Sequence, residues 1–159
     1  MEEVDKYRKR VRRYAGIFFV VGVLQLVMGT AGVLSADYLT LDEAIFYWMS
    51  GAFFLAGAIM TWNGARSGAL AILAWDVLIL VILIAGGEIT AVGLVRIGIY
   101  ITLAILMCVN AFRHWHAAHR AGALPVRGLA WLRWAGLAIV LPIGALSVPV
   151  IAYSVMPHA

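Results

Sequence analysis

The chain has 159 residues, of which 64% are hydrophobic and 13% are charged, and its mean hydropathy is +0.96. Soluble domains are nearer one half apolar and one quarter charged, so this composition excludes an ordinary water-soluble fold and is typical of a polytopic membrane protein. The net charge of +4 does not predict nucleic-acid binding, because the basic residues lie in short links between apolar runs. The single cysteine, Cys108, excludes intrachain disulfides and cysteine-built zinc sites.

The N-terminal segment, residues 1–13, is polar and contains six of the 12 Lys and Arg residues. Val4, Tyr7 and Val11 recur at the three- and four-residue spacing of one helix face. We therefore expect a short amphipathic helix at the cytoplasmic interface, with its basic face near anionic headgroups. It continues into the first apolar run, and no small-residue cleavage pattern predicts a secretory signal.

Five apolar runs follow, each close to or above the roughly 20 residues that an α-helix needs to cross about 30 Å of hydrocarbon. They cover residues 14–35, 44–62, 67–86, 89–112 and 129–153. Backbone polar groups find no water in the membrane core, so these runs must be helices rather than the shorter, alternating strands of a barrel. The predicted fold is an all-α integral membrane protein with about five transmembrane helices.

The charges of the links predict the orientation of these helices. Besides the six basic residues of the N-terminal segment, the links on the same side contain Arg66, Arg113, Arg120 and Arg127. The links on the opposite side contain no Lys or Arg, and their charged residues are Asp37, Asp42, Glu43 and Glu88. The positive-inside rule then predicts a cytoplasmic N-terminus and, with five spans, an outer C-terminus. We expect the membrane to be a bacterial plasma (inner) membrane, because short hairpins, a basic start and helices rich in small residues resemble the layout of many small bacterial membrane proteins.

The lengths of the links divide the chain into segments. Turns at Asn63-Gly64 and Gly86-Gly87 predict antiparallel neighbours, so we expect residues 14–112 to form a four-helix bundle. Residues 113–128 form a longer cytoplasmic link, and residues 129–159 comprise the fifth transmembrane helix and a short outer tail. Three residues predict a kink in that helix, which we place beside the bundle. They are Pro142, Gly144 and Pro149.

Two charged residues lie inside apolar runs, Asp76 in the third and Arg96 in the fourth. Each costs about 2.5–3.5 kcal/mol at the centre of a membrane helix, so each needs a partner or a function. Counted from the Gly86-Gly87 turn, the two residues have similar depths, which predicts an ion pair within the bundle. The pair has three interpretations: a structural clamp, part of a proton or anion pathway, or a contact for a buried polar group of a partner.

A mixed polar face follows Arg96 along the fourth run, where Tyr100, Met107 and Asn110 recur at helical spacing. Gln25 lies on one face of the first run together with several glycines. Lipid penalises polar side chains, so we expect these residues to face inward or toward another subunit. Close helix packing is the simpler interpretation, and a binding groove is the alternative.

Three histidines, His114, His116 and His119, gather at the end of the fourth run. They are weak candidates for a metal site, because only His116 and His119 have the spacing of ligands on one helix face. No carboxylate or cysteine lies near them in the sequence. We therefore expect no metal and no other cofactor, with the histidines adding positive charge at low pH.

No motif in the sequence predicts an enzyme. It contains no Gly-rich phosphate loop, serine nucleophile motif, HExxH motif or paired carboxylates. We expect a non-catalytic polytopic protein: an accessory, assembly or regulatory subunit of a larger membrane complex, or a homo-oligomer. Its partners are then the lipid bilayer and other membrane subunits or copies of itself. The alternative is a small-solute, ion or proton-coupled transporter that uses Asp76 and Arg96.

Overall fold

The computed structural model describes residues 2–34, 39–87 and 90–122. They form four α-helices: α1 (Glu2–Leu34), α2 (Leu41–Trp62), α3 (Arg66–Gly86) and α4 (Ala91–Arg120). This part of the chain contains no strand, which confirms the prediction of an all-helical protein. The predicted fifth helix, residues 129–153, lies outside the described residues.

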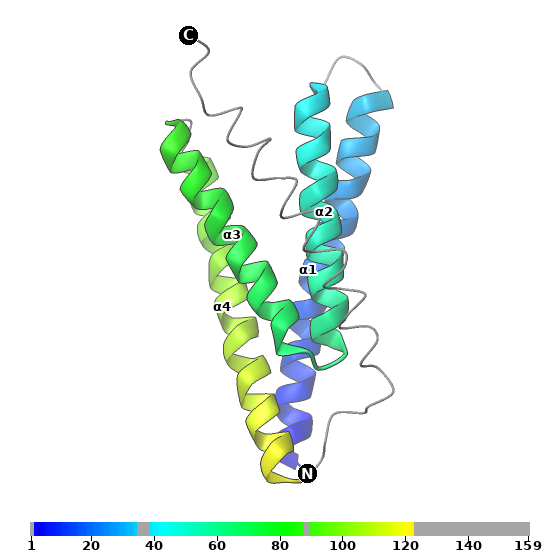
Figure 1. Ribbon diagram of the computed structural model, residues 1–159, viewed down its shortest axis with the longest axis vertical. Coiled ribbons are helices and arrows are strands. Elements are labelled where there is room, and N and C mark those ends of the chain that lie inside the picture. The colour runs from blue at the N-terminus through cyan, green and yellow to red at the C-terminus, as the bar shows by residue number, and fades with distance from the viewer. Residues whose placement is uncertain (1, 35–38, 88–89, 123–159) are drawn as a thin grey trace.

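Successive helices run antiparallel and pack in a ring, α1 against α2 and α4, and α3 against α2 and α4 (Figure 1). The contact between α1 and α2 is the most extensive of these four. Figure 1 shows the α3–α4 pair leaning away from the α1–α2 pair, toward the end opposite the N-terminus. Helices that fold back on themselves through short turns are the expected arrangement for consecutive spans.

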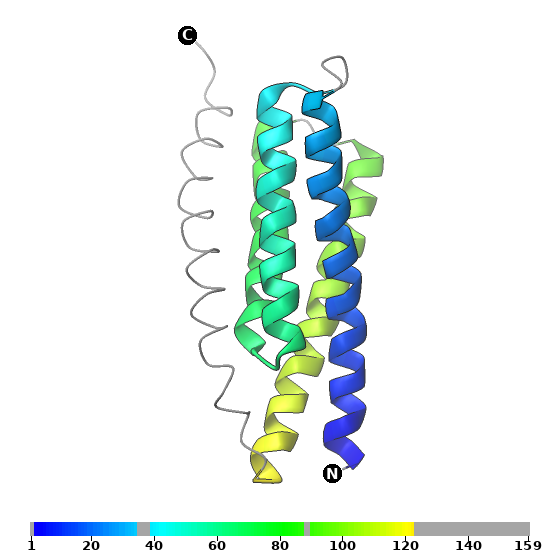
Figure 2. The same cartoon turned by 90° about the vertical axis from the view of Figure 1, so that its right-hand side faces the viewer.

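The helices differ in length, and the difference lies at one end of the bundle. All four are long and apolar enough to cross a membrane. α2 and α3 have 22 and 21 residues, about 32 Å, which matches the hydrocarbon thickness. α1 and α4 have 33 and 30 residues, and their extra turns extend beyond the α2–α3 turn at the end that holds the N-terminus (Figures 1 and 2). The basic N-terminal segment is thus, from Glu2, the first part of α1.

Side-chain caps and glycines set the ends of the helices. Thr40 precedes α2 in a capping box, in which its hydroxyl accepts from the Glu43 amide (3.4 Å) and its amide donates to the Glu43 carboxylate (2.8 Å). The Thr90 hydroxyl accepts from the amide of Gly93 at the start of α4 (3.1 Å). α3 ends at Gly86 and is capped by Gly87, whose φ of 68° lies in the left-handed region that glycine adopts without strain.

Small residues bring the helix backbones together. Gly22 of α1 and Gly51 of α2 face each other, and Gly57 of α2 faces Gly68 of α3. Such contacts favour helix association in lipid, where packing replaces the hydrophobic effect as the driving force. The largest fully buried apolar side chains fill the centre between the helices: Phe18, Phe54, Ile72 and Met107.

Candidate functional site

Asp76 lies in the interior of the bundle on α3, where its side chain is 3% exposed. Its Oδ2 atom is buried and has no hydrogen-bond partner among the described residues. The preceding residue, Trp75, is also buried and stacks on Phe53 of α2, with ring centroids 4.7 Å apart. Asp76 is therefore a buried residue of the bundle interior.

Two further polar side chains lie at the depth of Asp76. Because Gly57 faces Gly68 across antiparallel helices, Ser50 and Asp76 differ in depth by about one residue, or about 1.5 Å. The Gly22–Gly51 contact likewise places Gln25 of α1 within about 3 Å of the depth of Ser50.

Gln25, Ser50 and Asp76, which we call the polar layer, each have a buried oxygen without a hydrogen-bond partner in the described part of the chain. Buried polar atoms are normally paired, because each unpaired one costs about 1–3 kcal/mol. One oxygen from each of three helices therefore lies at one depth with its hydrogen-bonding capacity unused. A proton, a cation or a donor group of a ligand can use such oxygens.

Arg96 does not join the polar layer. It is exposed on α4, and its guanidinium lies over the ring of Tyr100, 5.8 Å from the centroid. The expected ion pair with Asp76 is not formed among the described residues.

The reason is the length of the turn between α3 and α4. Asp76 lies ten residues before the end of α3 at Gly86, whereas Arg96 lies only five after the start of α4 at Ala91. Counted within the two helices, the depths of the two charges therefore differ by about five residues, or about 7.5 Å.

The other members of the predicted polar face point inward to different degrees. Met107 is fully buried, Asn110 is 7% exposed and Gln25 is 8% exposed. The side-chain amide of Asn110 donates to the Leu106 carbonyl (2.7 Å), so that its polar group is partly satisfied within α4. Tyr100 is half-buried, with its ring 6.4 Å from that of Phe54. The face therefore contributes mainly to helix packing.

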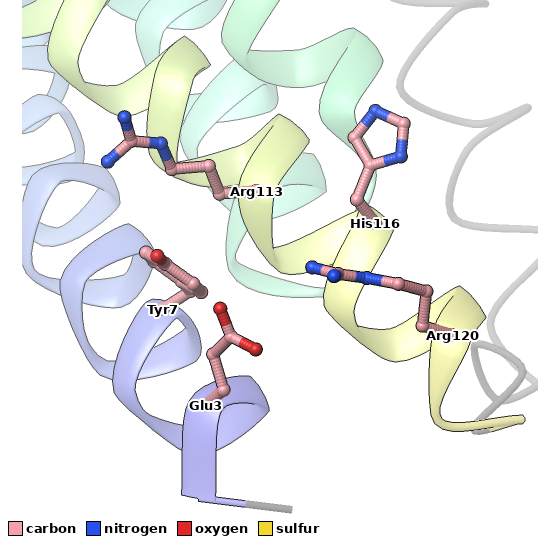
Figure 3. Close-up of a pocket in the computed structure, with 5 residues that line it drawn as sticks. All are labelled: Glu3, Tyr7, Arg113, His116 and Arg120. Carbon is pink, nitrogen blue, oxygen red and sulfur yellow. The ribbon is translucent and has the colours of Figure 1, made fainter.

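A second group of polar side chains lines a pocket where α1 and α4 extend past the other helices. The pocket has a volume of about 380 Å³, and its lining residues are Glu3, Tyr7, Arg113, His116 and Arg120. Figure 3 shows the two guanidinium groups extending from α4 toward α1, with Tyr7 and Glu3 opposite them. We call this the basic pocket.

Two of the three histidines, His116 and His119, contact the ring of Trp115, His116 edge-on with ring centroids 5.1 Å apart. His116 lines the basic pocket, and His119 stacks on Trp115, with ring centroids 5.3 Å apart and the planes inclined by 6°. His114 is half-buried. Within residues 2–34, 39–87 and 90–122, no three His, Cys, Asp or Glu side chains come together as metal ligands.

The basic pocket was not predicted from the sequence, because its two walls are more than 100 residues apart in the chain. A partial signal exists in the spacing of its residues. Glu3 and Tyr7 are four residues apart, and Arg113, His116 and Arg120 are three and four apart, so each set shares one helix face. Only the packing of α1 against α4 brings the two faces together.

The fold defines the class of this protein: an all-helical membrane protein whose described part contains four helices able to cross the bilayer. Comparisons with protein-family models, with curated proteins and with solved structures find no match to the chain.

Proposed function

We propose that the protein is a non-catalytic subunit that associates, through its helix faces in the membrane, with other subunits of a larger complex or with copies of itself. The observation that carries this proposal is the environment of Arg96. It is exposed on α4 between Val95 and Ile99, which are 64% and 54% exposed. A charge on a lipid-facing surface is costly, so a polar or acidic group of a neighbouring subunit is its expected partner.

The direction of the Arg96 side chain supports this proposal. An arginine near the end of a membrane helix usually extends toward the nearer interface, where its charge stays hydrated. The guanidinium of Arg96 instead lies over the ring of Tyr100, which is one turn deeper in the membrane. This position leaves the charge available to a partner at that depth.

The proposed topology has five spans, with the N-terminus in the cytoplasm of a bacterium and the protein in its inner membrane. The distribution of basic residues supports this orientation, since six of them precede the first span and Arg113 and Arg120 lie at the same end of the bundle. A reporter fused after Ala159 tests the number of spans: a periplasmic signal is expected, and a cytoplasmic signal contradicts the five-span topology.

The association is tested by extracting the tagged protein from its native membrane in a mild detergent. Native mass analysis and identification of the co-purifying proteins then give the composition of the assembly. We expect a stoichiometric partner or a homo-oligomer that Arg96→Leu dissociates. The matched control is Val95→Leu, which changes the adjacent exposed residue without changing charge. A wild-type protein that is monomeric and alone, or an assembly that Arg96→Leu leaves intact, contradicts the proposal.

The polar layer favours a second candidate function, a proton-coupled or ion-coupled transporter. Its carboxylate, Asp76, has no cationic partner among the described residues, and intramembrane acids of this kind commonly bind protons or ions. Proton movement into proteoliposomes under an imposed membrane potential tests this function. A transporter requires a flux that Asp76→Asn abolishes and Asp5→Asn, which changes an exposed carboxylate on α1, preserves. The absence of flux in the wild type argues for the subunit.

A further inference from the structure

The basic pocket lies where the membrane-spanning part of the bundle ends. α1 and α4 continue past the α2–α3 turn, and the pocket lies between these extra turns (Figures 1 and 3). Residue 112 closes the fourth apolar run, and Arg113 is the next residue. When the apolar segments of the helices occupy the hydrocarbon, Arg113 lies at the depth of the lipid headgroups.

The pocket has the chemistry of a phosphate site. Arg113 and Arg120 contribute two guanidinium groups, which bind phosphate oxygens through paired hydrogen bonds. Neither guanidinium has an ion-pair partner in the described part of the chain. The Tyr7 hydroxyl adds a further group that can donate a hydrogen bond. The His116 ring points away from Tyr7 and Glu3 and packs edge-on against Trp115 (Figure 3).

Glu3 restricts which phosphate-containing ligands fit this site. Its carboxylate is part of the lining, opposite the arginines, and can only accept hydrogen bonds when it is ionised (Figure 3). A ligand that carries a hydroxyl or a primary ammonium group beyond its phosphate can bind the arginines through the phosphate and donate a hydrogen bond to Glu3 through that group. A ligand with a quaternary ammonium group has no hydrogen to donate to Glu3.

The surface next to the pocket favours a lipid over a soluble phosphate. On the membrane side of the pocket, α4 exposes Val109 and Leu106, one and two turns from Arg113 on the same helix face. These apolar side chains provide a surface for acyl chains when the headgroup is in the pocket. Basic pockets at the cytoplasmic ends of membrane helices are a known type of headgroup site.

We propose that the basic pocket binds the headgroup of a phospholipid, with Arg113 and Arg120 on the phosphate and Glu3 accepting a hydrogen bond from the hydroxyl or ammonium group beyond it. This site is more specific than the general attraction of the basic N-terminal segment to anionic lipid. It also provides a contact by which the lipid holds the ends of α1 and α4 together.

The test is a titration of the full-length protein in detergent with phosphatidylglycerol, with bound lipid counted by native mass spectrometry. We expect the double variant Arg113→Gln/Arg120→Gln to weaken binding by about tenfold or more, because two charge-assisted hydrogen-bonding groups are lost. The matched control is Arg10→Gln/Arg13→Gln, which removes the same charge from exposed positions of α1 outside the pocket. Equal weakening by both double variants overturns the proposal, because it reduces the interaction to general electrostatics.

Two further measurements distinguish the source of the phosphate and the role of Glu3. Glycerol 3-phosphate, a free phosphate, is expected not to displace the lipid, and displacement at comparable concentrations overturns the lipid assignment. The wild type is expected to prefer phosphatidylethanolamine to phosphatidylcholine, which has the same net charge but no ammonium hydrogen, and Glu3→Gln to reduce this preference. Because Glu3 is exposed, this variant tests the pocket even if the arginine variant unfolds. An unchanged preference in Glu3→Gln contradicts the assigned role of the carboxylate.

Discussion

Gly22 of α1 and Gly51 of α2 approach each other so closely that neither position has room for a side chain. A Cβ atom on Gly22 would lie 2.9 Å from the carbonyl oxygen of Gly51, and one on Gly51 would lie 2.8 Å from that of Gly22. The obstacle is backbone in both cases, so only a shift of the helices can relieve it. This contact sets the offset between α1 and α2, and therefore the depth that Gln25 and Ser50 share.

Substitution at this contact is expected to destabilise the bundle. Gly51→Ala forces α1 and α2 apart, and overpacking of this kind costs about 1–3 kcal/mol. The loss is measured as a lower free energy of unfolding in detergent micelles.

The matched control for that variant is Gly98→Ala. No heavy atom lies within 4 Å of the position of an added Cβ on Gly98, which is exposed in the third turn of α4. Alanine there is expected to be neutral or to stabilise by up to about 1 kcal/mol, because it has the higher helix propensity. Equal effects of the two variants contradict the close approach of α1 and α2.

Asp76 and Arg96 are expected to contribute to stability independently. The depth difference between them predicts that the effects of Asp76→Asn and Arg96→Leu add to within about 0.5 kcal/mol in a double-mutant cycle. Asp76→Asn alone is expected to preserve or raise the unfolding temperature, because it removes a buried carboxyl group whose Oδ2 accepts no hydrogen bond within the described chain. A coupling energy well above 1 kcal/mol in that cycle indicates that the ion pair forms after all.

Arg66 connects the start of α3 to the end of α4 through aromatic rings. Its guanidinium lies 3.9 Å from the centroid of the Trp115 ring and 5.4 Å from that of Phe112. We expect Arg66→Gln to lower the free energy of unfolding by about 1 kcal/mol through loss of the cation–π contact. Thermal unfolding in micelles measures this loss, with Arg13→Gln as the control for removal of an exposed charge. If both variants lose the same stability, the rings are not the cause.

The capping box of α2 gives a further prediction. Thr40→Ala removes the hydroxyl that accepts from the Glu43 amide, and we expect a loss of about 1 kcal/mol of stability, which Thr40→Ser restores. Thr102→Ala is the control, since the Thr102 hydroxyl donates only to the Gly98 carbonyl within α4 (2.7 Å) and caps no helix end. Chemical denaturation of the three variants distinguishes these effects, and a Thr102→Ala loss as large as that of Thr40→Ala argues against the cap.

The apolar runs located the described helices well, but their ends were predicted less accurately. The second run was expected to start at residue 44, whereas α2 begins at Leu41, directly after the Thr40 cap. The fourth was expected to end at residue 112, whereas α4 continues to Arg120. Hydrophobicity marks the part of a helix that lipid surrounds, and a helix that continues into water beside another helix gives no such signal.

The sequence identified individual residues of the candidate site, but it did not predict which of them lie at the same depth. Isolated charges in apolar runs identified Asp76 and Arg96 as unusual, and the burial of Asp76 agrees with that prediction. The predicted ion pair between them is not formed. Their depths were counted from the Gly86-Gly87 turn, whereas α4 begins only at Ala91. Ser50 was missed, because a single serine in an apolar run has no distinguishing signal until its depth is known.

The hydrophobicity of the sequence was sufficient to identify the lipid bilayer as the environment of this protein and to predict the number and approximate positions of the described helices. These properties are local, because in lipid each segment must satisfy its own backbone hydrogen bonds and match the hydrocarbon thickness. The tertiary structure alone decided which polar side chains share a depth in the polar layer and which meet in the basic pocket. Those relationships depend on the offset and rotation of one helix against another, which turn lengths and glycine contacts such as Gly22–Gly51 set.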